Sequence, residues 1–333
     1  MLSSILLLIV VSASAQTAPA YRYFRVGNAA NMAATPRAGY ALMGGGTDLD
    51  EAFEWLCARA GGGDLLVLRA SGDDAYNPYI EKLCHLNSVA TMVIPSKEAA
   101  MDPFVARAIE QASAVFISGG DQSNYINFWQ GTPVEASLNA AIKRGVPIGG
   151  TSAGLAVLGE WAYTAQGDKP GDPNLDGKTA MADPYGPRIT LSHDFVEIPI
   201  LKGIITDTHF ARRDRMGRLL VFLARLNSGD GKLPAQGLGV RGIGVEQGAA
   251  VLLEADGKVT VVGKGAAYFV DAGNASGVTV ERNQALTYGD FGVQKVASGK
   301  GFDLKSWSGD ATKYELSVKA GKIVSTQAGG GVY

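Results

Sequence analysis

The strongest chemical signal in the sequence is a serine in a glycine-rich turn, in the segment Gly149-Gly150-Thr151-Ser152-Ala153-Gly154. A strand-like run, 146–148, precedes the turn, and a helix-like run, 155–160, follows it. A serine between small residues at a strand-to-helix turn has the geometry of a nucleophile elbow, and glycine is favoured because a Cβ atom would clash there. A plain βα turn with an N-cap serine gives the same pattern, so the motif alone leaves both interpretations open.

A nucleophilic serine needs a base, and the chain has only three histidines. His85 is expected in a helix and His193 in a strand or turn, where a structural role suffices. His209 follows an apolar run, 204–205, and should lie at the end of a strand, where open parallel sheets bind ligands. Four arginines follow it, and they could line a site or form a solvated helix face: Arg212, Arg213, Arg215 and Arg218.

The order of these groups argues against two hydrolase classes. An α/β-hydrolase places its histidine after the acid and near the C-terminus, but no histidine follows His209. A cysteine-dependent glutamine amidotransferase needs a cysteine at the elbow, where this chain has Ser152. The sequence has no P-loop and no cluster with metal-ligand spacing, so no metal or organic cofactor is expected.

A second glycine turn could assist the serine. The segment Ser118-Gly119-Gly120-Asp121-Gln122 follows a strand-like run, 114–117. Backbone N–H groups in this turn could form an oxyanion hole facing Ser152.

Composition sets the class of protein. The chain has 333 residues, 46% of them hydrophobic and 19% charged, which is typical of a globular protein and not of a disordered, collagen-like or coiled-coil chain. Its 30 basic and 32 acidic residues give a net charge of −2. That balance gives no reason to expect nucleic acid or an anionic membrane as a partner.

The order of apolar runs and glycine turns along the chain predicts one architecture. From Gly39 to about residue 148, short apolar strands alternate with glycine turns and helices, which predicts an α/β fold with a doubly wound parallel sheet covered on both faces. After about Asn227 short β-like segments follow, beginning with a hairpin around Asp256-Gly257. We therefore expect a signal peptide at 1–15, an α/β domain at 16–262 and a C-terminal β-rich extension at 263–333.

The first residues are typical of a secretory signal. A short apolar run, 5–11, is followed by Ala13-Ser14-Ala15, which has the form that signal peptidase cleaves. The run lacks a preceding Lys or Arg, so an ordinary buried segment is the alternative. Secretion or export to the periplasm, with cleavage after Ala15, would permit a Cys57–Cys84 disulfide. Two separate buried thiols fit the sequence equally well.

Together these motifs carry a family resemblance. The segment 116–122, the turn around Ser152, and Asp207-Thr208-His209-Phe210 with its arginines resemble the cyanophycinase and aspartyl dipeptidase family of serine peptidases. The likeness spans roughly Gly39 to Glu254, and the three motifs in this order are far more specific than any one alone. The family fold resembles that of class I glutamine amidotransferases.

The resemblance implies a role for each matching residue. Ser152 would be the nucleophile, His209 the general base, and backbone N–H groups near Gly120 and Asp121 the oxyanion hole. The implied substrate-binding residues are Gln122, Asp207, Thr208, Arg213, Arg215 and Arg218. Guanidinium groups pair well with carboxylates, and family members cut peptides at aspartyl residues. The implied substrate is an acidic or isoaspartyl peptide or polymer such as β-Asp-Arg units; whether the chain forms a homodimer stays open.

The sequence departs from the family in two places. Thr208 stands where the family usually has Gln. Gln247 aligns with the catalytic Glu, with Glu246 just before it as a candidate substitute acid. Neighbours on a strand face opposite sides, so Glu246 would need a local bulge to reach the histidine. Replacing the triad carboxylate by a carboxamide can cost about 10⁴ in rate.

Three hypotheses follow, in order of preference. The first is an exported serine peptidase that cuts peptide or isopeptide bonds next to aspartate. The second is a catalytically weakened relative that binds acidic peptides. The third is an esterase with an unusual Ser-His-acid order.

Overall fold

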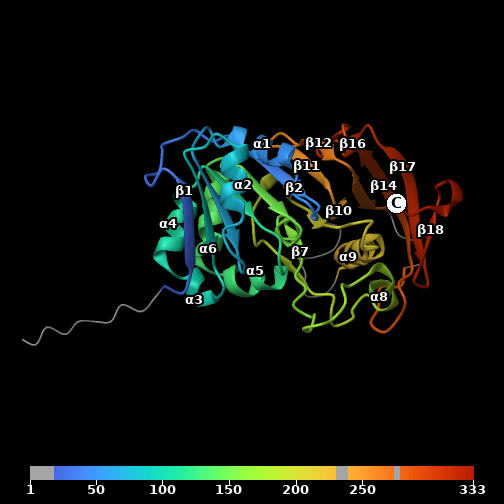
Figure 1. Ribbon diagram of the computed structural model, residues 1–333. Coiled ribbons are helices and arrows are strands. Elements are labelled where there is room, and N and C mark those ends of the chain that lie inside the picture. Colours follow the sequence, from blue (N-terminus) through green and yellow to red (C-terminus); the bar gives the residue numbers. More distant parts are fainter. Residues whose placement is uncertain (1–18, 230–238, 274–277) are drawn as a thin grey trace, which may run out of the picture.

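The chain folds into two large mixed β-sheets with helices packed around them (Figure 1). This computed structural model describes residues 19–229, 239–273 and 278–333. The expected signal segment, 1–15, lies outside the described residues. Across these three ranges, no helix is long and apolar enough to span a membrane.

The first sheet contains the nucleophile strand. In the described residues it has ten strands in the order β1-β4-β3-β5-β6-β2-β11-β12-β15-β16. The central strands β4, β3, β5, β6 and β2 are parallel, whereas β1 and β11 pair antiparallel with their outer members. The bounds are β1 Arg22–Gly27, β2 Gly39–Met43, β3 Asp64–Arg69, β4 Ser88–Val93, β5 Ala114–Ile117, β6 Ile148–Thr151, β11 Ala249–Glu254, β12 Lys258–Gly263, β15 Gly301–Asp303 and β16 Ser308–Gly309.

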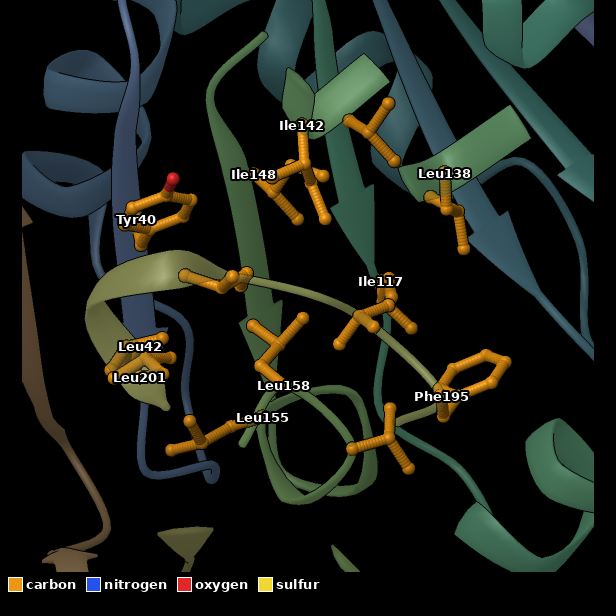
Figure 2. Packing of buried hydrophobic residues seen from close by; sticks show 14 of the residues in the cluster. Tyr40, Leu42, Ile117, Leu138, Ile142, Ile148, Leu155, Leu158, Phe195 and Leu201 are labelled. Carbon is orange, nitrogen blue, oxygen red and sulfur yellow. The ribbon is translucent and has the colours of Figure 1, made fainter. Parts of the chain in front are cut away.

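Helices cover both faces of the parallel strands, because successive strand residues point to opposite sides. Met43 packs with Phe53 of α1 on one face, whereas its neighbour Leu42 belongs to the cluster that contains Trp129 and Leu138 on the other. Figure 2 shows part of that larger cluster. The helices on the first face are α1 Asp50–Arg59 and α2 Tyr76–Leu83; those on the second are α3 Lys97–Ala100, α4 Pro103–Gln111, α5 Gln122–Trp129 and α6 Pro133–Lys143.

The second sheet carries the histidine strand. Its eight strands within the described ranges have the order β18-β17-β14-β13-β10-β9-β7-β8, and β7, β9 and β10 are parallel. Helix α9, Met216–Ser228, is buried from Met216 to Leu226 and forms the core of this half with α8, Gly177–Ala182. The strands are β7 Trp161–Tyr163, β8 Leu191–His193, β9 Ile204–Asp207, β10 Arg241–Val245, β13 Ala266–Ala272, β14 Tyr288–Ala297, β17 Thr312–Lys319 and β18 Lys322–Ser325.

The expected α/β class is confirmed, but the sheets are mixed rather than wholly parallel. The parallel prediction holds for the five central strands of the first sheet. It is wrong at the edges, because the β11–β12 hairpin pairs antiparallel with β2 and so extends the same sheet. The hairpin turns at Gly257 as expected, with φ of 100°. Strand β11 begins at Ala249, four residues after Val245 ends β10 in the other sheet.

Strands after residue 263 belong to both sheets. Strands β15 and β16 extend the first sheet beyond β12, whereas β13, β14, β17 and β18 extend the second beyond β10. In Figure 1 the strands β14, β17 and β18 lie at the opposite end of the molecule from β1 and α4. Long-range strand pairing therefore ties the last 70 or so residues to the rest of the fold.

The two cysteines form a disulfide. Cys57 lies in α1 and Cys84 directly follows α2, and their Sγ atoms are 2.06 Å apart. Both residues are buried. The disulfide thus joins the two helices on one face of the first sheet, and it settles the choice that the sequence left open.

Removing this disulfide should destabilise the protein without changing the fold. The bridge joins residues 27 positions apart, and closing a loop of that size stabilises a fold by about 3 kcal/mol, chiefly by restricting the unfolded chain. We expect the Cys57→Ser/Cys84→Ser double variant to lose that much free energy of unfolding in urea titrations, and the parent to behave alike after reduction. An unchanged midpoint in both samples would contradict the structural role.

Candidate active site

Ser152 lies in the strained turn between β6 and the short helix α7, Ala153–Ala156. Its φ of 52° and ψ of −118° are unusual for a residue with a side chain. A Cβ atom at Gly150 would lie 2.7 Å from the Gly154 carbonyl, and one at Gly154 would lie 2.0 Å from the Ile117 oxygen. Only glycine fits at these two positions, so the sequence expectation of a crowded elbow agrees with the geometry.

His209 meets Ser152 from the second sheet. It directly follows Asp207-Thr208 at the end of β9, as expected, and its φ is 46°. The Ser152 hydroxyl donates to His209 Nε2 across 2.7 Å. The backbone N–H of His209 donates to the Gly44 carbonyl at 2.7 Å, which fixes the residue against the end of β2.

The turn Gly44-Gly45-Gly46 after β2 makes this contact possible. A Cβ atom at Gly45 would lie 2.5 Å from the His209 ring and 3.0 Å from the Ser152 Cβ. A Cβ atom at Gly46 would lie 2.3 Å from the side chain of Gln247. The available signal was a run of glycines at the carboxyl end of a parallel strand.

Gln247 completes the arrangement at the position that the sequence aligns with the family's acid. Its Oε1 lies 3.1 Å from His209 Nδ1. Because Oε1 is an acceptor, Nδ1 carries the proton and Nε2 presents its lone pair to the serine hydroxyl. The carboxamide therefore sets the tautomer that a general base needs.

Glu246 points elsewhere. Its Oε1 accepts a hydrogen bond from Tyr268 Oη at 2.6 Å, and its Oε2 accepts one from the Ala266 N–H at 3.0 Å. Both partners belong to β13, so the carboxylate does not contact His209. The contacts give no support to Glu246 as the substitute acid, because the turn leaves the two neighbouring side chains on different sides.

The surroundings of His209 favour the neutral imidazole. Burial lowers its pKa from 6.5 to about 4, the Gln247 hydrogen bond raises it, and the charges of Arg213 and Arg215 lower it further. The imidazole is therefore unprotonated at neutral pH and ready to accept a proton. Among the described residues no carboxylate bonds to the ring, so a developing imidazolium gains little stabilisation from them.

The glycine turn after β5 lies beside the nucleophile. A Cβ atom at Gly119 would lie 3.5 Å from the Ser152 Cβ. Tyr125 Oη donates to the carbonyls of Ser118 and Gly119, at 2.9 and 3.2 Å, and so holds the turn from its inner side. Within the described part of the chain, the N–H groups of Gly120 and Asp121 have no hydrogen-bond acceptor. Tyr125 was not singled out by the sequence analysis.

A cavity of about 540 Å³ opens next to Ser152. Of the sequence-predicted substrate residues it brings together Gln122, Thr208, Arg213, Arg215 and Arg218, along with Gly120 and Asp121. Residues 168–172, 174 and 175 also line the cavity. The Asp121 side chain caps α5 by accepting from the Ser123 N–H at 2.9 Å.

Asp207 is a buried partner of the arginines and does not line the cavity. Its carboxylate accepts two hydrogen bonds from Arg218, at 2.5 and 2.8 Å, and lies 3.6 Å from Arg215. The Arg218 guanidinium also lies 4.9 Å from the centre of the Tyr163 ring. Arg218 is thus fully paired and orders the cavity wall rather than offering a free charge.

Arg215 and Arg213 place two guanidinium groups at the cavity. Arg215 is buried and bonds to the Thr208 carbonyl and hydroxyl, at 2.9 and 3.0 Å, while its Nε has no partner among the described residues. Burial, followed by the charge of Arg218, lowers the pKa of Arg215 to about 9. Arg213 is exposed and bonds to Asn174 at 3.0 Å. Asp168 and Asp172 also line the cavity but pair with Arg188, so the guanidinium groups of Arg213 and Arg215 are placed to bind an anion.

The remaining candidates lie apart from this site. His85 and His193 are both exposed, and His193 pairs with its neighbour Asp194 at 2.5 Å. In the described ranges no group of three or more His, Cys, Asp or Glu side chains is placed to hold a metal ion.

Comparison with known proteins agrees with this geometry. The model of peptidase family S51 matches residues 42–182, which include Ser152. Cyanophycinase of Synechococcus elongatus is 24% identical over 262 residues, 75% of this chain and 73% of that protein. Cyanophycinase of Geminocystis herdmanii is 30% identical over 193 residues, 57% of this chain and 56% of that protein.

A solved structure shares the fold. The crystal structure of a peptidase from an acI-B1 Actinobacterium superimposes with a TM-score of 0.51 at 15% identity, covering 81% of this chain and 98% of that one. The family match, the cyanophycinase relatives and the shared fold agree with one another. The chain is similar to peptidase family S51 over residues 42–182 and is a serine-type peptidase.

Proposed function

We propose that this peptidase hydrolyses peptide or isopeptide bonds next to aspartyl residues, with β-Asp-Arg units of cyanophycin as the leading substrate. One observation carries the proposal: the Ser152 hydroxyl bonds to His209 Nε2 at the mouth of a cavity lined by Arg213 and Arg215. The cyanophycinase relatives support the choice of substrate.

Acylation uses the contacts around Ser152. Its Oγ attacks the scissile carbonyl carbon while His209 Nε2 takes the hydroxyl proton. The N–H groups of Gly120 and Asp121 are free to donate to the oxyanion that forms. His209 then delivers the proton to the leaving amine, and the acyl group remains on the serine as an ester.

Deacylation reverses the proton path. His209 removes a proton from water, the resulting hydroxide attacks the ester, and the proton returns to Ser152. Gln247 holds the ring in the required tautomer through both half-reactions. Because its carboxamide has no charge, we expect a rate below that of a carboxylate triad.

The cavity arginines give the preference for acidic substrates. Arg213 is an exposed residue of the cavity lining, and the buried Arg215 has an Nε with no partner in the described part of the chain. A substrate carboxylate bound between them would gain charge-assisted hydrogen bonds. Thr208 bonds to Arg215 and so holds the guanidinium at this wall.

We further propose that the chain is exported and that its core follows the class I glutamine amidotransferase pattern. The signal-like residues 5–15 support export, and so does the Cys57–Cys84 disulfide, since such bonds persist in oxidising compartments. The helices on both faces of the parallel strands support the second point.

Gln247 favours one alternative, a weakened relative that binds acidic peptides without cutting them. The cavity and its arginines would serve a binding protein equally well. The first prediction separates the two.

The parent protein should release β-Asp-Arg from cyanophycin, and Ser152→Ala should release none. Removing Oγ eliminates the nucleophile while leaving the cavity and its arginines in place. The measurement is dipeptide release by mass spectrometry, with Ser123→Ala as the matched control on the cavity rim. Binding of cyanophycin by both proteins without release by either would establish the binding alternative.

Gln247→Glu should speed the reaction and shift its pH dependence. In the parent, kcat/KM is expected to fall only as the pH drops through about 4, where His209 becomes protonated. A carboxylate beside the ring favours imidazolium, so the acid limb of the kcat/KM profile should move to higher pH. The plateau of kcat/KM should rise by at most about 10⁴-fold. Glu246→Gln should leave the acid limb in place. An acid limb unchanged in Gln247→Glu would contradict the assigned contact.

Arg213→Gln should raise KM for an acidic substrate by about 10-fold with little change in kcat, since a charge-assisted hydrogen bond is lost. Arg212→Gln is the matched control, because it removes the same charge from a neighbouring exposed residue that does not line the cavity. The difference should shrink in high salt. Equal KM changes in the two variants would show that Arg213 acts only through general charge.

A further inference from the structure

The loop that carries His209 and the cavity arginines is held in an unfavourable conformation. It joins β9 to α9 and contains His209, Arg213 and Arg215. Two of its residues with side chains, His209 and Asp214, have φ of 46° and 47°. Such residues keep these angles only where surrounding contacts hold them.

Tyr333 makes those contacts from the far end of the sequence. Its hydroxyl accepts a hydrogen bond from the Met216 N–H at the start of α9 and donates one to Asp214 Oδ1, both at 2.9 Å. Burial raises the pKa of the Tyr333 hydroxyl, so it stays protonated and able to donate. A single side chain thus fixes the strained Asp214 and the first turn of the helix after it.

The Tyr333 ring also belongs to an aromatic cluster, formed with Phe210 and Tyr268. Its centre lies 6.0 Å from Phe210 and 5.9 Å from Tyr268, edge-on to both. Phe210 directly follows His209, and Tyr268 bonds to Glu246, the neighbour of Gln247. The cluster therefore contains the chain neighbour of His209 and bonds to the chain neighbour of Gln247.

The C-terminal strands hold Tyr333 in place. Tyr314 of β17 donates a hydrogen bond from its hydroxyl to the Val332 carbonyl at 2.8 Å. This bond anchors the residue just before Tyr333 to the second sheet. The strands after residue 263 are thus connected to the active-site loop through Tyr333.

We propose that Tyr333 is a positioning residue for catalysis, which keeps His209 and the cavity arginines in their working arrangement by clamping the loop 209–215. The inference rests on the proposed Ser152–His209 pair. It also gives the C-terminal strands a role in the reaction, beyond their place in the sheet.

The test is the rate at which a fluorophosphonate labels Ser152 in the full-length protein at 25 °C, because labelling needs the serine and its base but no particular substrate. Tyr333→Phe removes the two hydrogen bonds and keeps the ring, and should slow labelling by about 5- to 30-fold. Asp214→Asn should retain the parental rate, since its carboxamide oxygen still accepts from Tyr333 and Asn tolerates positive φ. Tyr288→Phe, which removes a hydroxyl from β14 away from the loop, is the matched control.

Each outcome either supports or overturns the role of Tyr333 as a clamp. Slow labelling in Tyr333→Phe with parental rates in Asp214→Asn and Tyr288→Phe supports the clamp, provided that the melting temperature stays well above 25 °C. Parental labelling in Tyr333→Phe overturns it. If that variant does not fold, Tyr314→Phe replaces it and should also be slowed; a parental rate there overturns the clamp. If Ser152 of the parent protein is not labelled, its assignment as the nucleophile is wrong. The proposed function then fails, independently of the clamp.

Discussion

The whole structure depends on bringing one hydroxyl to one imidazole nitrogen across the boundary between two sheets. Ser152 directly follows β6 of the first sheet, His209 lies two residues after β9 of the second, and both have positive φ. The 2.7 Å contact between them is possible only because Gly45 has no side chain to separate them. The strain in both turns is therefore offset by packing elsewhere, with close backbone contacts at Gly150 and Gly154 on one side and the Gly44 carbonyl on the other.

Charge is arranged to leave the base neutral and to place guanidinium groups in the cavity beside it. Burial and the nearby arginines disfavour imidazolium, and Gln247 supplies direction without charge. Asp207 sits beneath the arginines, pairs with Arg218 and keeps the cluster from being wholly uncompensated. The same positive charge that would attract an acidic substrate also works against protonation of His209. A bound carboxylate would reduce that conflict, because it would offset the charge of Arg213 and Arg215 while the proton is transferred.

The sequence predicted what local patterns determine. The elbow at Ser152 and the position of His209 after a strand both follow from short-range patterns. The alignment of Gln247 with the acid position also matched its contact with His209. The structural function of Gly45, the disulfide and the clamp by Tyr333 could not be read this way. Tyr333 lies 119 residues from Asp214, and no periodicity or turn signal records a pairing over that distance.

The most direct test of this account is the pKa of His209, measured by nuclear magnetic resonance on protein labelled with ¹⁵N in its three histidines. The His209 signal is identified by its loss in His209→Gln. The account predicts a pKa near 4, with the ring protonated at Nδ1 at neutral pH. A pKa of 6.5 or above would contradict it, because the imidazole would then be hydrated or paired with a carboxylate rather than buried against Gln247.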